Sequence, residues 1–454
     1  MFKDNEIKKY CSSPRSLANE VLKRIFKGDK PSFPIDPFVI LDSLDVVYQF
    51  RDFEDLEGIY IVPEDENDIA IVGINNNRPI TRQRFTAAHE LCHYLKDSKI
   101  SNICPIDGRL KTTVEKFADD FASELLMPYK YLKEEVDNYC IDGYISFEDV
   151  LKVSEYFGVS FEACVFNIAY KLKKISGNTS PQKLKSRINK FKPNAKKIEL
   201  GIVNNDKLLV TNIIDSYKLF FENCSKSVWY KFKNEFIFNE NRLEGVEIDE
   251  EDVAELVTDL RVKQQESEYC GTEYKDIIEV LGHSSVYDYI TTTDDGISAF
   301  SILNLHKMLY QYAPYPEEGG KTRNSNNFVT AAEFETVEYC NIINEIFKLD
   351  SKVKELIGNL DMLKVSEYIY QVVEIHHRIT VIHPFHDGNG RTSRAFLNWL
   401  FRLKNIPPVY LKYTEKDKYY NALKKADNGN FDDLSIIFYK QVFLTMIKLN
   451  NTII

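Results

Sequence analysis

The residues from His383 to Arg394 bring an imidazole, a carboxylate, a glycine-rich turn and two guanidinium groups together in one short run. The turn at 388–390, Gly-Asn-Gly, has the backbone freedom that a tight bend needs. Apolar residues then recur at helical spacing as far as residue 403, so we predict a helix that begins at the turn. The free N–H groups at the start of such a helix favour an anionic ligand.

The charged groups of this run suit a nucleotide. Arg391 and Arg394 are three residues apart, share one face of the first helical turn, and can clamp a polyphosphate. Asp387 can hold the divalent metal that nucleotides require, and a neutral His383 is the expected proton acceptor. The competing interpretation is a plain turn between two helices with solvated arginines, which is disfavoured because all these groups fall within one run.

The run resembles the motif of the Fic family, HxFx[D/E]GNGRxxR, at every specified position. This resemblance implies an all-helical Fic fold that transfers AMP from ATP to a Ser, Thr or Tyr hydroxyl of a target protein. The Doc branch of the family, which phosphorylates its targets, is less similar because its motif has Lys where this chain has Arg391. A phosphotransferase, or a transferase that uses UTP, is therefore kept as an alternative.

The resemblance also implies the roles of the individual groups. His383 is the general base, Asp387 carries Mg²⁺, Arg391 supports the β-phosphate and Arg394 holds the γ-phosphate. The N–H groups of the turn at 388–390, together with the side chain of its Asn, hold the phosphates.

Two further segments extend the expected nucleotide site. Residues 418–423 are similar to the family segment whose first Tyr lines the adenosine pocket, which implies that role for Tyr419. The family also has a flap that aligns the target, here placed with its hairpin turn at Gly319-Gly320 and its edge strand at 327–329. The expected ATP-binding residues are Asp387, Gly388, Asn389, Gly390, Arg391, Thr392, Ser393, Arg394, Tyr419, Gly319 and Gly320.

Residues 238–245 resemble the inhibitory helix motif of Fic proteins, [S/T]xxxE[G/N]. Glu244 and Gly245 match this motif, whereas Glu240 stands where Ser or Thr is expected. The resemblance implies that Glu244 pairs with Arg394 and keeps the enzyme inactive. The alternative is that Glu244 is one more acid in an acidic stretch.

A second group of reactive residues lies at His89-Glu90-Leu-Cys-His93. Two histidines at i and i+4 project from one face of a helix and can hold one zinc ion, with Glu90 placed to take a proton from a bound water. A catalytic zinc needs a third protein ligand. The alternative is a pair of polar histidines on a surface helix.

The blocks at 84–94 and 115–128 resemble the ImmA/IrrE metallopeptidases, and the similarity extends over about residues 15–175. It implies zinc on His89, His93 and Glu115, with Glu90 as the general base. Asp119 stands where that family often has Asn, and Asp119 or Glu124 is a substitute for Glu115 as third ligand. Members of that family often cleave a DNA-binding repressor, while a metal-binding sensor without peptidase activity is the rival interpretation.

The predicted elements place these groups in two domains of different class. We predict helices at 15–27, 82–96, 113–127, 297–310, 331–348 and 362–379, short strands within 40–50 and 59–74 with a turn at Glu57-Gly58, and a strand pair within 198–213. The expected fold is multidomain, an α+β zincin-like N-terminal domain followed by an all-α Fic-fold domain. The expected boundaries are 1–178 for the metallopeptidase-like domain, 179–234 for a connecting segment, and 235–454 for the Fic domain with its inhibitory helix.

Composition limits the partners. A net charge of −11 argues against a generic nucleic-acid binder, and the basic run at 183–197 is better explained as a solvated helix face. The eight cysteines form no CxxC pair, and no apolar run reaches the length of a membrane span, so we expect a reduced, cytoplasmic protein. The expected ligands are ATP, Mg²⁺, Zn²⁺ and a hydroxyl-bearing target protein, and a homodimer is left open. The main alternative function is a regulatory metallopeptidase that cleaves a repressor-type protein, with the Fic half acting as a nucleotide sensor.

Overall fold

The chain divides into two compact units, which are described separately. The first comprises residues 1–216 with residues 450–454, and the second comprises residues 217–449. The computed structural model describes residues 7–63, 69–97, 102–105, 112–177, 179–202, 206–216, 229, 232–246, 249–251, 253–254, 257, 275–326 and 336–452. The predicted flap strand at 327–329 lies outside these residues. Among the described residues, no helix combines the length and the apolar character that a membrane span needs.

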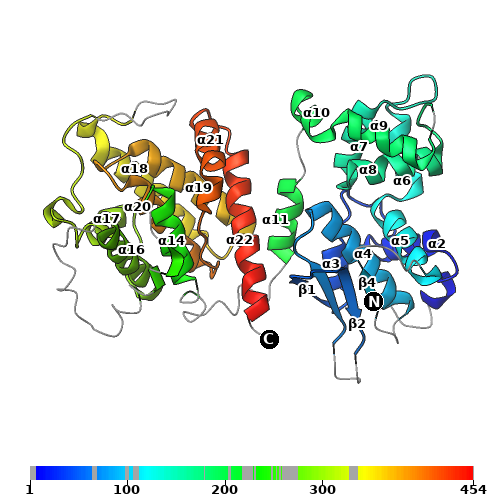
Figure 1. Cartoon of the computed structure of the whole chain (residues 1–454), viewed down its shortest axis with the longest axis horizontal. Helices are drawn as coiled ribbons and strands as arrows, with labels where there is room; N and C mark the ends of the chain where they lie inside the picture. The colour runs from blue at the N-terminus through cyan, green and yellow to red at the C-terminus, as the bar shows by residue number, and fades with distance from the viewer. Residues whose placement is uncertain are drawn as a thin grey trace. The chain divides into compact units, whose positions relative to one another are not determined.

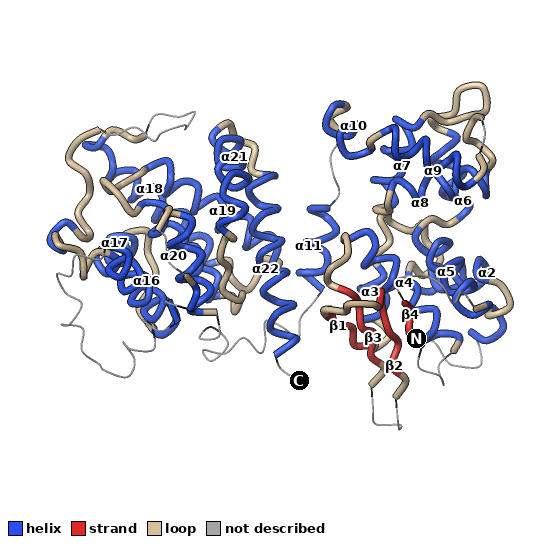
Figure 2. The backbone as a smooth tube through the Cα atoms, in the orientation of Figure 1, coloured by secondary structure: helices blue, strands red, loops and turns tan. Residues whose placement is uncertain are grey.

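The first unit contains a four-stranded mixed sheet with the order β1-β3-β2-β4 (Figure 1). β1 (Val47–Arg51) runs parallel to β3 (Ile71–Asn75), whereas β2 (Leu56–Ile61) is antiparallel to β3 and to β4 (Asn102–Pro105). Figure 2 shows how few strands this unit has beside its many helices. The predicted α+β class of the first unit is therefore confirmed.

Three helices position the His-Glu group of this unit. α4 (Ile80–Lys96) packs against β2 and β3, and α5 (Thr113–Leu126) packs against both α4 and α2 (Pro14–Ile25). α5 begins where the Thr112 hydroxyl accepts a hydrogen bond from the Glu115 N–H, a regular N-cap. These helices agree with the predicted ranges to within two residues at each end.

Gly58 was predicted to form a turn, and that prediction is wrong because Gly58 lies within β2. A Cβ atom at this position would lie 2.4 Å from the Thr86 methyl group and 2.7 Å from Glu90 Oε1, both on α4. The glycine therefore marks the place where the helix approaches the sheet, not a bend in the chain.

One strand prediction in this unit is confirmed only in part, because β1 occupies just the end of the range 40–50, and another is wrong. Residues 40–42 belong to α3 (Pro37–Asp42), because the Asp36 carboxylate caps a helix that has Pro at its first position. The region 198–213 contains no strand among its described residues, and α10 (Pro193–Glu199) and α11 (Asp206–Ser216) occupy it instead. Leu209, Val210, Ile213 and Ile214 are buried at helical spacing, so tertiary packing overrides the β-branched character of the valine and the two isoleucines.

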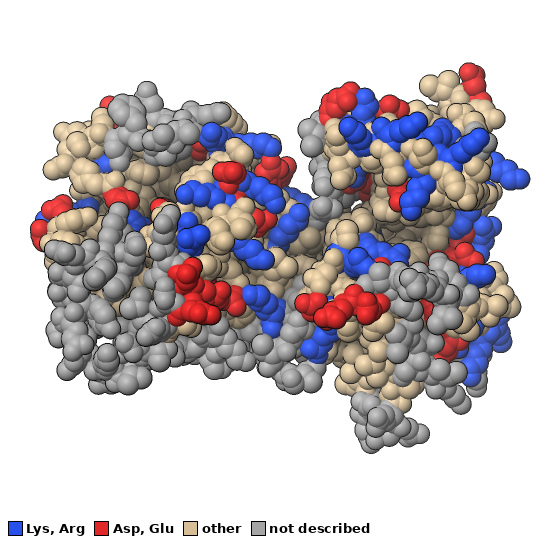
Figure 3. Space-filling view, in the orientation of Figure 1, with Lys and Arg blue, Asp and Glu red and all other residues tan. Residues whose placement is uncertain are grey.

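The first unit has six further helices among its described residues, the last of which carries most of the basic run. They are η1 (Lys8–Tyr10), α6 (Tyr129–Asp137), α7 (Phe147–Phe157), α8 (Phe161–Asn167), η2 (Ile168–Leu172) and α9 (Pro181–Phe191). On α9, Leu184 and Ile188 are buried while the basic side chains lie on the opposite, more exposed face. Figure 3 shows Lys and Arg side chains gathered over this region.

The second unit is helical throughout its described residues, in agreement with the predicted all-α class. Its elements are α14 (Lys233–Leu243), α16 (Lys275–Thr292), α17 (Ser301–Leu309), η4 (Pro316–Glu318), η5 (Tyr339–Asn341), α18 (Ile342–Gly358), α19 (Val365–Ile382), α20 (Asn389–Leu403), η6 (Tyr413–Glu415), α21 (Lys416–Asp427) and α22 (Asp432–Thr452). α20 packs against α16, α17 and α19 and is buried along most of its length, as expected of a helix in the middle of a helical core. α18 begins at Ile342, so the helix predicted at 331–348 starts later than the sequence suggested.

Candidate functional site

The turn before α20 fixes the position of the charged motif. Gly388 has φ +75°, the left-handed conformation, and caps the helix that begins at Asn389. A Cβ atom at Gly390 would lie 2.9 Å from Arg394 Nη1 and 3.1 Å from Glu244 Oε1, so only glycine allows these groups to approach the backbone. A Cβ atom at Gly388 would lie 2.9 Å from the Tyr310 ring, so this glycine lets the turn pack closely against its neighbours.

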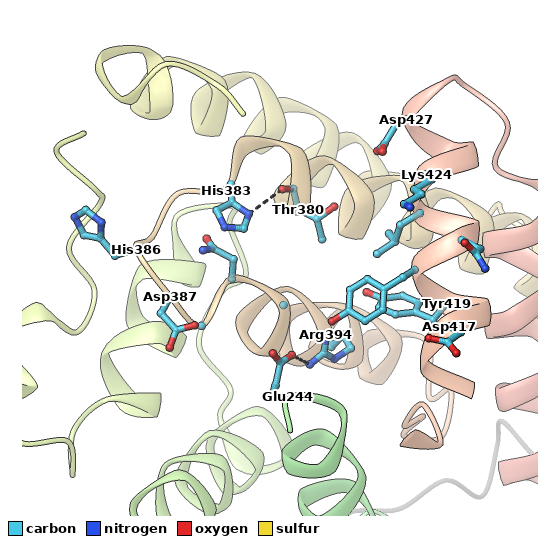
Figure 4. A pocket seen from close by; sticks show the side chains of 16 residues that line it. Glu244, Thr380, His383, His386, Asp387, Arg394, Asp417, Tyr419, Lys424 and Asp427 are labelled. Atoms are coloured by element: carbon cyan, nitrogen blue, oxygen red, sulfur yellow. Dashed lines mark hydrogen bonds and ion pairs between the residues drawn. The ribbon is translucent and has the colours of Figure 1, made fainter. Parts of the chain in front are cut away.

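A cavity of about 660 Å³ lies at the start of α20 (Figure 4). Its lining joins the motif loop, the start of α20, α21 and the end of α14. The lining residues are Glu244, Thr380, His383, His386, Asp387, Gly388, Asn389, Gly390, Arg394, Asp417, Tyr419, Tyr420, Asn421, Leu423, Lys424 and Asp427. Nucleotide-binding sites of other proteins have volumes of this order.

His383 lies at the cavity with one ring nitrogen already committed. Its Nδ1 lies 3.3 Å from the Thr380 carbonyl oxygen, so Nδ1–H donates and Nε2 keeps its lone pair. Burial lowers the pKa of His383 below its ordinary value, which keeps the imidazole neutral at physiological pH. The residue therefore has the protonation state that a general base requires.

Arg323 holds the backbone of this histidine and was missed by the sequence analysis. Its side chain is almost fully buried, and its Nε donates to the His383 carbonyl oxygen at 2.8 Å. Its backbone N–H donates to the Pro384 carbonyl oxygen, also at 2.8 Å. His383 itself has φ +49°, an uncommon conformation for a non-glycine residue, which these two bonds help to maintain.

His306, on α17, is a second residue that the sequence analysis did not single out. Its Nδ1 accepts a hydrogen bond from the Gly320 N–H at 2.9 Å, so its Nε2–H donates to the Asp387 carbonyl oxygen at 3.0 Å. Its ring stacks on Phe385 with 3.7 Å between centroids, and burial lowers its pKa to about 4. A neutral His306 therefore locks the motif loop onto α17.

Asp387 is the predicted metal-binding carboxylate, and its side chain is 73% exposed. Oδ2 accepts hydrogen bonds from the Tyr310 hydroxyl at 2.8 Å and from Arg391 Nη2 at 3.0 Å. Burial of the group acts to raise its pKa, but Arg391 and Tyr310 lower it overall, so the carboxylate is ionised. An ionised, exposed carboxylate beside a phosphate-sized cavity fits a Mg²⁺ ion.

Arg394 is held by two carboxylates instead of one. Its Nε lies 2.6 Å from Glu240 Oε2, and its Nη2 lies 2.6 Å from Glu244 Oε1 (Figure 4). The Glu240 side chain is 1% exposed and that of Glu244 is 27% exposed. Burial raises the pKa of Glu240 against the opposing effect of Arg394, whereas at Glu244 the guanidinium groups of Arg394 and Arg391 outweigh burial and lower the pKa. Glu244 is therefore a charged partner at the cavity wall, and Glu240 is a buried anchor behind it.

Tyr419 lines the cavity as the sequence predicted, and its hydroxyl makes a 2.8 Å hydrogen bond with His376 Nε2. His376 and His377 lie in α19 and are buried, so both pack within the helical core.

Several residues predicted to bind ATP lie elsewhere. Thr392 and Ser393 are buried away from the cavity, and the Ser393 hydroxyl donates to the Gly390 carbonyl oxygen. Gly319 and Gly320 pack against α17. Arg391, which was expected to support the β-phosphate, donates hydrogen bonds to Tyr310 and Asp387. None of these five belongs to the described lining of the cavity.

The side chain of Asn389 closes the motif loop instead of facing a ligand. Its Oδ1 accepts from the Phe385 N–H and its Nδ2 donates to the Phe385 carbonyl oxygen, both at 2.9 Å. The part of Asn389 that is directed toward an anion is its backbone, at the start of α20.

In the first unit, the two histidines of α4 meet one carboxylate of α5. His89 Nε2 lies 3.1 Å from Glu115 Oε2, and His93 Nε2 lies 3.2 Å from His89 Nε2 and 3.5 Å from Glu115 Oε1. On the other side of each ring, Nδ1 lies 3.1 Å from a carboxylate, Asp119 for His89 and Asp97 for His93. Nδ1–H thus donates to each acid, and the two Nε2 lone pairs converge with Glu115 on one point, which is an arrangement that a metal cation fits.

Asp119 and Glu124 were kept as substitutes for Glu115, and their contacts differ. Asp119 lies on the Nδ1 side of His89, where a carboxylate orients a metal-binding imidazole without touching the metal. Glu124 accepts hydrogen bonds from Arg15 and Lys171, away from the two histidines. Glu115 is therefore the acid that the fold brings to both Nε2 atoms.

Glu90 is the buried acid of this group, with a relative exposure of 0%. Among the described residues, neither of its carboxylate oxygens has a hydrogen-bond partner. Burial raises its pKa to about 8. A buried acid without a partner is costly, and its presence points to a ligand at this centre.

Comparison with known proteins assigns both regions. Residues 42–169 match the IrrE N-terminal-like domain, and residues 296–401 match the Fic/DOC family.

Two curated relatives each match about a third of this chain. The chain is 28% identical over 160 residues to a protein adenylyltransferase Fic of Nematostella vectensis, which covers 34% of this chain and 35% of the relative. It is 30% identical over 158 residues to that of Aedes aegypti, covering 34% and 30%. The chain thus spans about a third of the length of these relatives. A solved structure of Fic-1 from Caenorhabditis elegans superposes with a TM-score of 0.45 at 15% identity, covering 72% of this chain and 98% of that one. Residues 42–169 are thus similar to the IrrE N-terminal-like domain, and residues 296–401 are similar to the Fic/DOC family.

Proposed function

We propose that the second unit transfers AMP from ATP to a hydroxyl side chain of a protein. The observation that carries this proposal is the cavity shared by the Nε2 side of His383, the N-terminus of α20 and Arg394. The residues that match the Fic/DOC family include all three, and the curated relatives are named protein adenylyltransferases.

The transfer is a substitution at the α-phosphorus of ATP. The target oxygen forms a bond to that phosphorus, its proton passes to Nε2 of His383, and the bond to the bridging oxygen breaks so that pyrophosphate leaves. His383 can accept the proton because its Nδ1–H is held by Thr380 and its pKa is lowered by burial.

The remaining groups stabilise the negative charge of the ATP phosphates. The N–H groups at the start of α20 face the phosphates, and Arg394, once free of its acidic partners, faces the γ-phosphate. Asp387 would hold Mg²⁺, which neutralises charge on the phosphate oxygens when it is bound. Tyr419 closes the adenosine side of the cavity.

We further propose that Glu244 keeps this unit inactive. A guanidinium paired with Glu244 and Glu240 is not available to the γ-phosphate, and the two carboxylates repel the nucleotide. ATP that binds beside this pair is then misaligned with His383, and a shift of about 1 Å costs on the order of a hundredfold in rate.

The test of the transfer is an incubation of the Glu244→Gly variant with labelled ATP and a lysate of the source organism. Label from the adenine ring or the α-phosphate should appear on protein, with the mass of AMP added to the modified peptide. Label from the γ-phosphate alone would overturn the proposal in favour of a phosphotransferase, and label from UTP alone would change the donor.

A second function is proposed for the first unit, a zinc-dependent peptidase or zinc sensor. It rests on the convergence of His89, His93 and Glu115 beside the unpartnered acid Glu90. Zinc, when bound, would polarise a water molecule or a carbonyl group, and Glu90 is the residue placed to take a proton. A repressor-type protein is the substrate class that the family resemblance suggests.

Metal analysis of the purified chain tests this second function. We expect one zinc per chain, lost when His89 and His93 are both replaced by Ala. A chain purified without zinc, and unable to take it up, would refute the centre. A zinc-loaded Glu90→Gln variant that cleaves as well as the parent would refute only the role of Glu90.

A further inference from the structure

The strand β4 brings a thiol to the metal centre of the first unit. Cys104 is paired with Gly58 across the antiparallel β2–β4 ladder. Residues directly opposite each other in such a pair project from the same face of the sheet. At Gly58 that face is the one covered by α4, because a Cβ atom there would lie 2.7 Å from Glu90 Oε1. The register of the sheet thus directs the Cys104 side chain toward the His-Glu helix.

The side-chain atoms agree with the register. The sulfur of Cys104 and the ligand atoms of His89 and Glu115 all lie within 4.8 Å of one another. Bond lengths of about 2.3 Å to sulfur and 2.0 Å to nitrogen put the two atoms roughly 3.6 Å apart across a tetrahedral zinc. Atoms that lie within 4.8 Å of one another are therefore near the separation of ligands that share one metal ion.

We propose that Cys104 is the fourth ligand of this centre, so that zinc is held by His89, His93, Glu115 and Cys104. This inference rests on the metal centre of the proposed function. It adds that the centre has no coordination position open to water. Four protein ligands make a closed site, whereas a catalytic zinc keeps one position for water. The thiol occupies the position that water would need.

The unpartnered carboxylate of Glu90 is the independent sign of a ligand here. It is fully buried, and neither oxygen has a partner among the described residues. With the thiolate in place, Glu90 has no water to deprotonate, and the resting unit holds zinc without cleaving. Exchange of the thiolate for water is a ligand substitution without oxidation or reduction, in which the departing sulfur takes up one proton.

Cobalt substitution of the full chain tests the proposal without relying on activity. Co²⁺ accepts the same ligands as zinc, and a thiolate ligand adds a charge-transfer band in the near ultraviolet. We expect this band in the parent chain, its loss in Cys104→Ser, and its retention in the matched control Cys140→Ser. Cys140 belongs to the same unit and lies outside the cluster. Zinc should bind Cys104→Ser about tenfold or more weakly than the parent.

X-ray absorption of the zinc-loaded parent gives a measurement that needs no variant. One sulfur neighbour at about 2.3 Å is expected in addition to the lighter ligands. Cobalt or zinc that binds stoichiometrically without any sulfur signal would overturn the inference and leave the three-ligand centre intact. A parent chain that binds neither metal would overturn the centre itself, and the role of Cys104 with it.

Discussion

In the second unit, the buried guanidinium of Arg394 has two carboxylate oxygens at 2.6 Å, one from Glu240 and one from Glu244. In the first unit, the buried carboxylate of Glu90 has no partner among the described residues, and two imidazole nitrogens face each other at 3.2 Å. A nucleotide must therefore displace protein groups that already satisfy the cation of its site. A metal ion, in contrast, supplies the positive charge that the other site lacks.

This difference makes opposite demands on the two ligands. The Arg394 site of the second unit should gain little stability from its ligand, because binding exchanges one set of charge pairs for another. The histidine site of the first unit should gain stability, because a ligand that binds only the folded state shifts the folding equilibrium toward the folded state. Each prediction below tests one side of this comparison.

Removal of the base should have the largest effect. In a Glu244→Gly background, His383→Ala should lower the rate of AMP transfer by about 10³-fold, since the base is lost while the phosphate-binding groups stay. ATP binding, measured by calorimetry, should be unchanged. His386→Ala is the matched control, because His386 is an exposed histidine of the same loop (Figure 4). Equal transfer rates for both variants would remove His383 from the mechanism.

Removal of the metal should destabilise the first unit and leave the stability of the second unit unchanged. A chelator should lower the unfolding temperature of the first unit by roughly 10 °C, the effect expected for about 4 kcal/mol of ligand stabilisation in a unit of this size. The transition of the second unit should not move. The His89→Ala, His93→Ala double variant should unfold at the lower temperature with or without chelator. If neither the chelator nor added zinc changes the unfolding temperature of the parent chain, the first unit does not gain stability from a metal.

Release of the acidic pair should raise the activity of the second unit. Glu244→Gly should increase AMP transfer, including self-modification, at least tenfold, because a preference of ~2.7 kcal/mol for the paired state leaves roughly 1% of molecules competent. Glu244→Asp should be intermediate, because the shorter side chain reaches Arg394 poorly. Equal labelling by the parent and both variants would show that Glu244 is only a surface acid.

Glu240 sharpens this prediction, because it keeps a carboxylate on Arg394 Nε after Glu244 is removed. The Glu240→Gln, Glu244→Gly double variant should therefore exceed Glu244→Gly by about threefold or more, the size of a fraction of one charge-assisted bond. Glu240→Gln is a close match in shape, so its folding should be preserved, which a thermal melt can check. A double variant slower than Glu244→Gly would mean that Glu240 orients Arg394 productively.

The pH profile should show the smallest effect. The pKa of His383 is lowered from 6.5 by burial, so the base stays neutral to a lower pH than a free imidazole. In the Glu244→Gly background, the midpoint of the decline of kcat/KM on the acid side should therefore lie below pH 6.5. A midpoint above 6.5 would contradict the environment described for His383.

The sequence was sufficient where one short segment carries both structure and chemistry. The motif loop, the helix after it and the HExxH helix combine turn residues, periodicity and reactive groups, so their form and place could be predicted. His306 and Arg323 could not, because each acts through a backbone carbonyl oxygen that only the tertiary fold brings near. The same holds for Thr392 and Ser393, since the register of a helix against its neighbours decides which side chains reach a cavity.

The misread glycine and the unpredicted strand have one physical cause. Gly58 looks like a turn residue in isolation, and its role as the point of contact between β2 and α4 depends on residues on another element. β4 is too short for a periodic signal, and it forms because β2 offers it an edge. Cys104 therefore looked like one of several scattered cysteines until the register of that edge was known.

The acids Glu240 and Glu244 and their partner Arg394 all belong to the second unit of a single chain. The pairing of Arg394 with the two acids is therefore an intramolecular equilibrium. The fraction of paired molecules does not depend on the protein concentration. Dilution will not release it, and overproduction will not strengthen it. If Glu244 holds the unit inactive as proposed, overproduction raises the number of competent molecules in proportion but leaves their fraction unchanged. That fraction is set by whatever separates the pair.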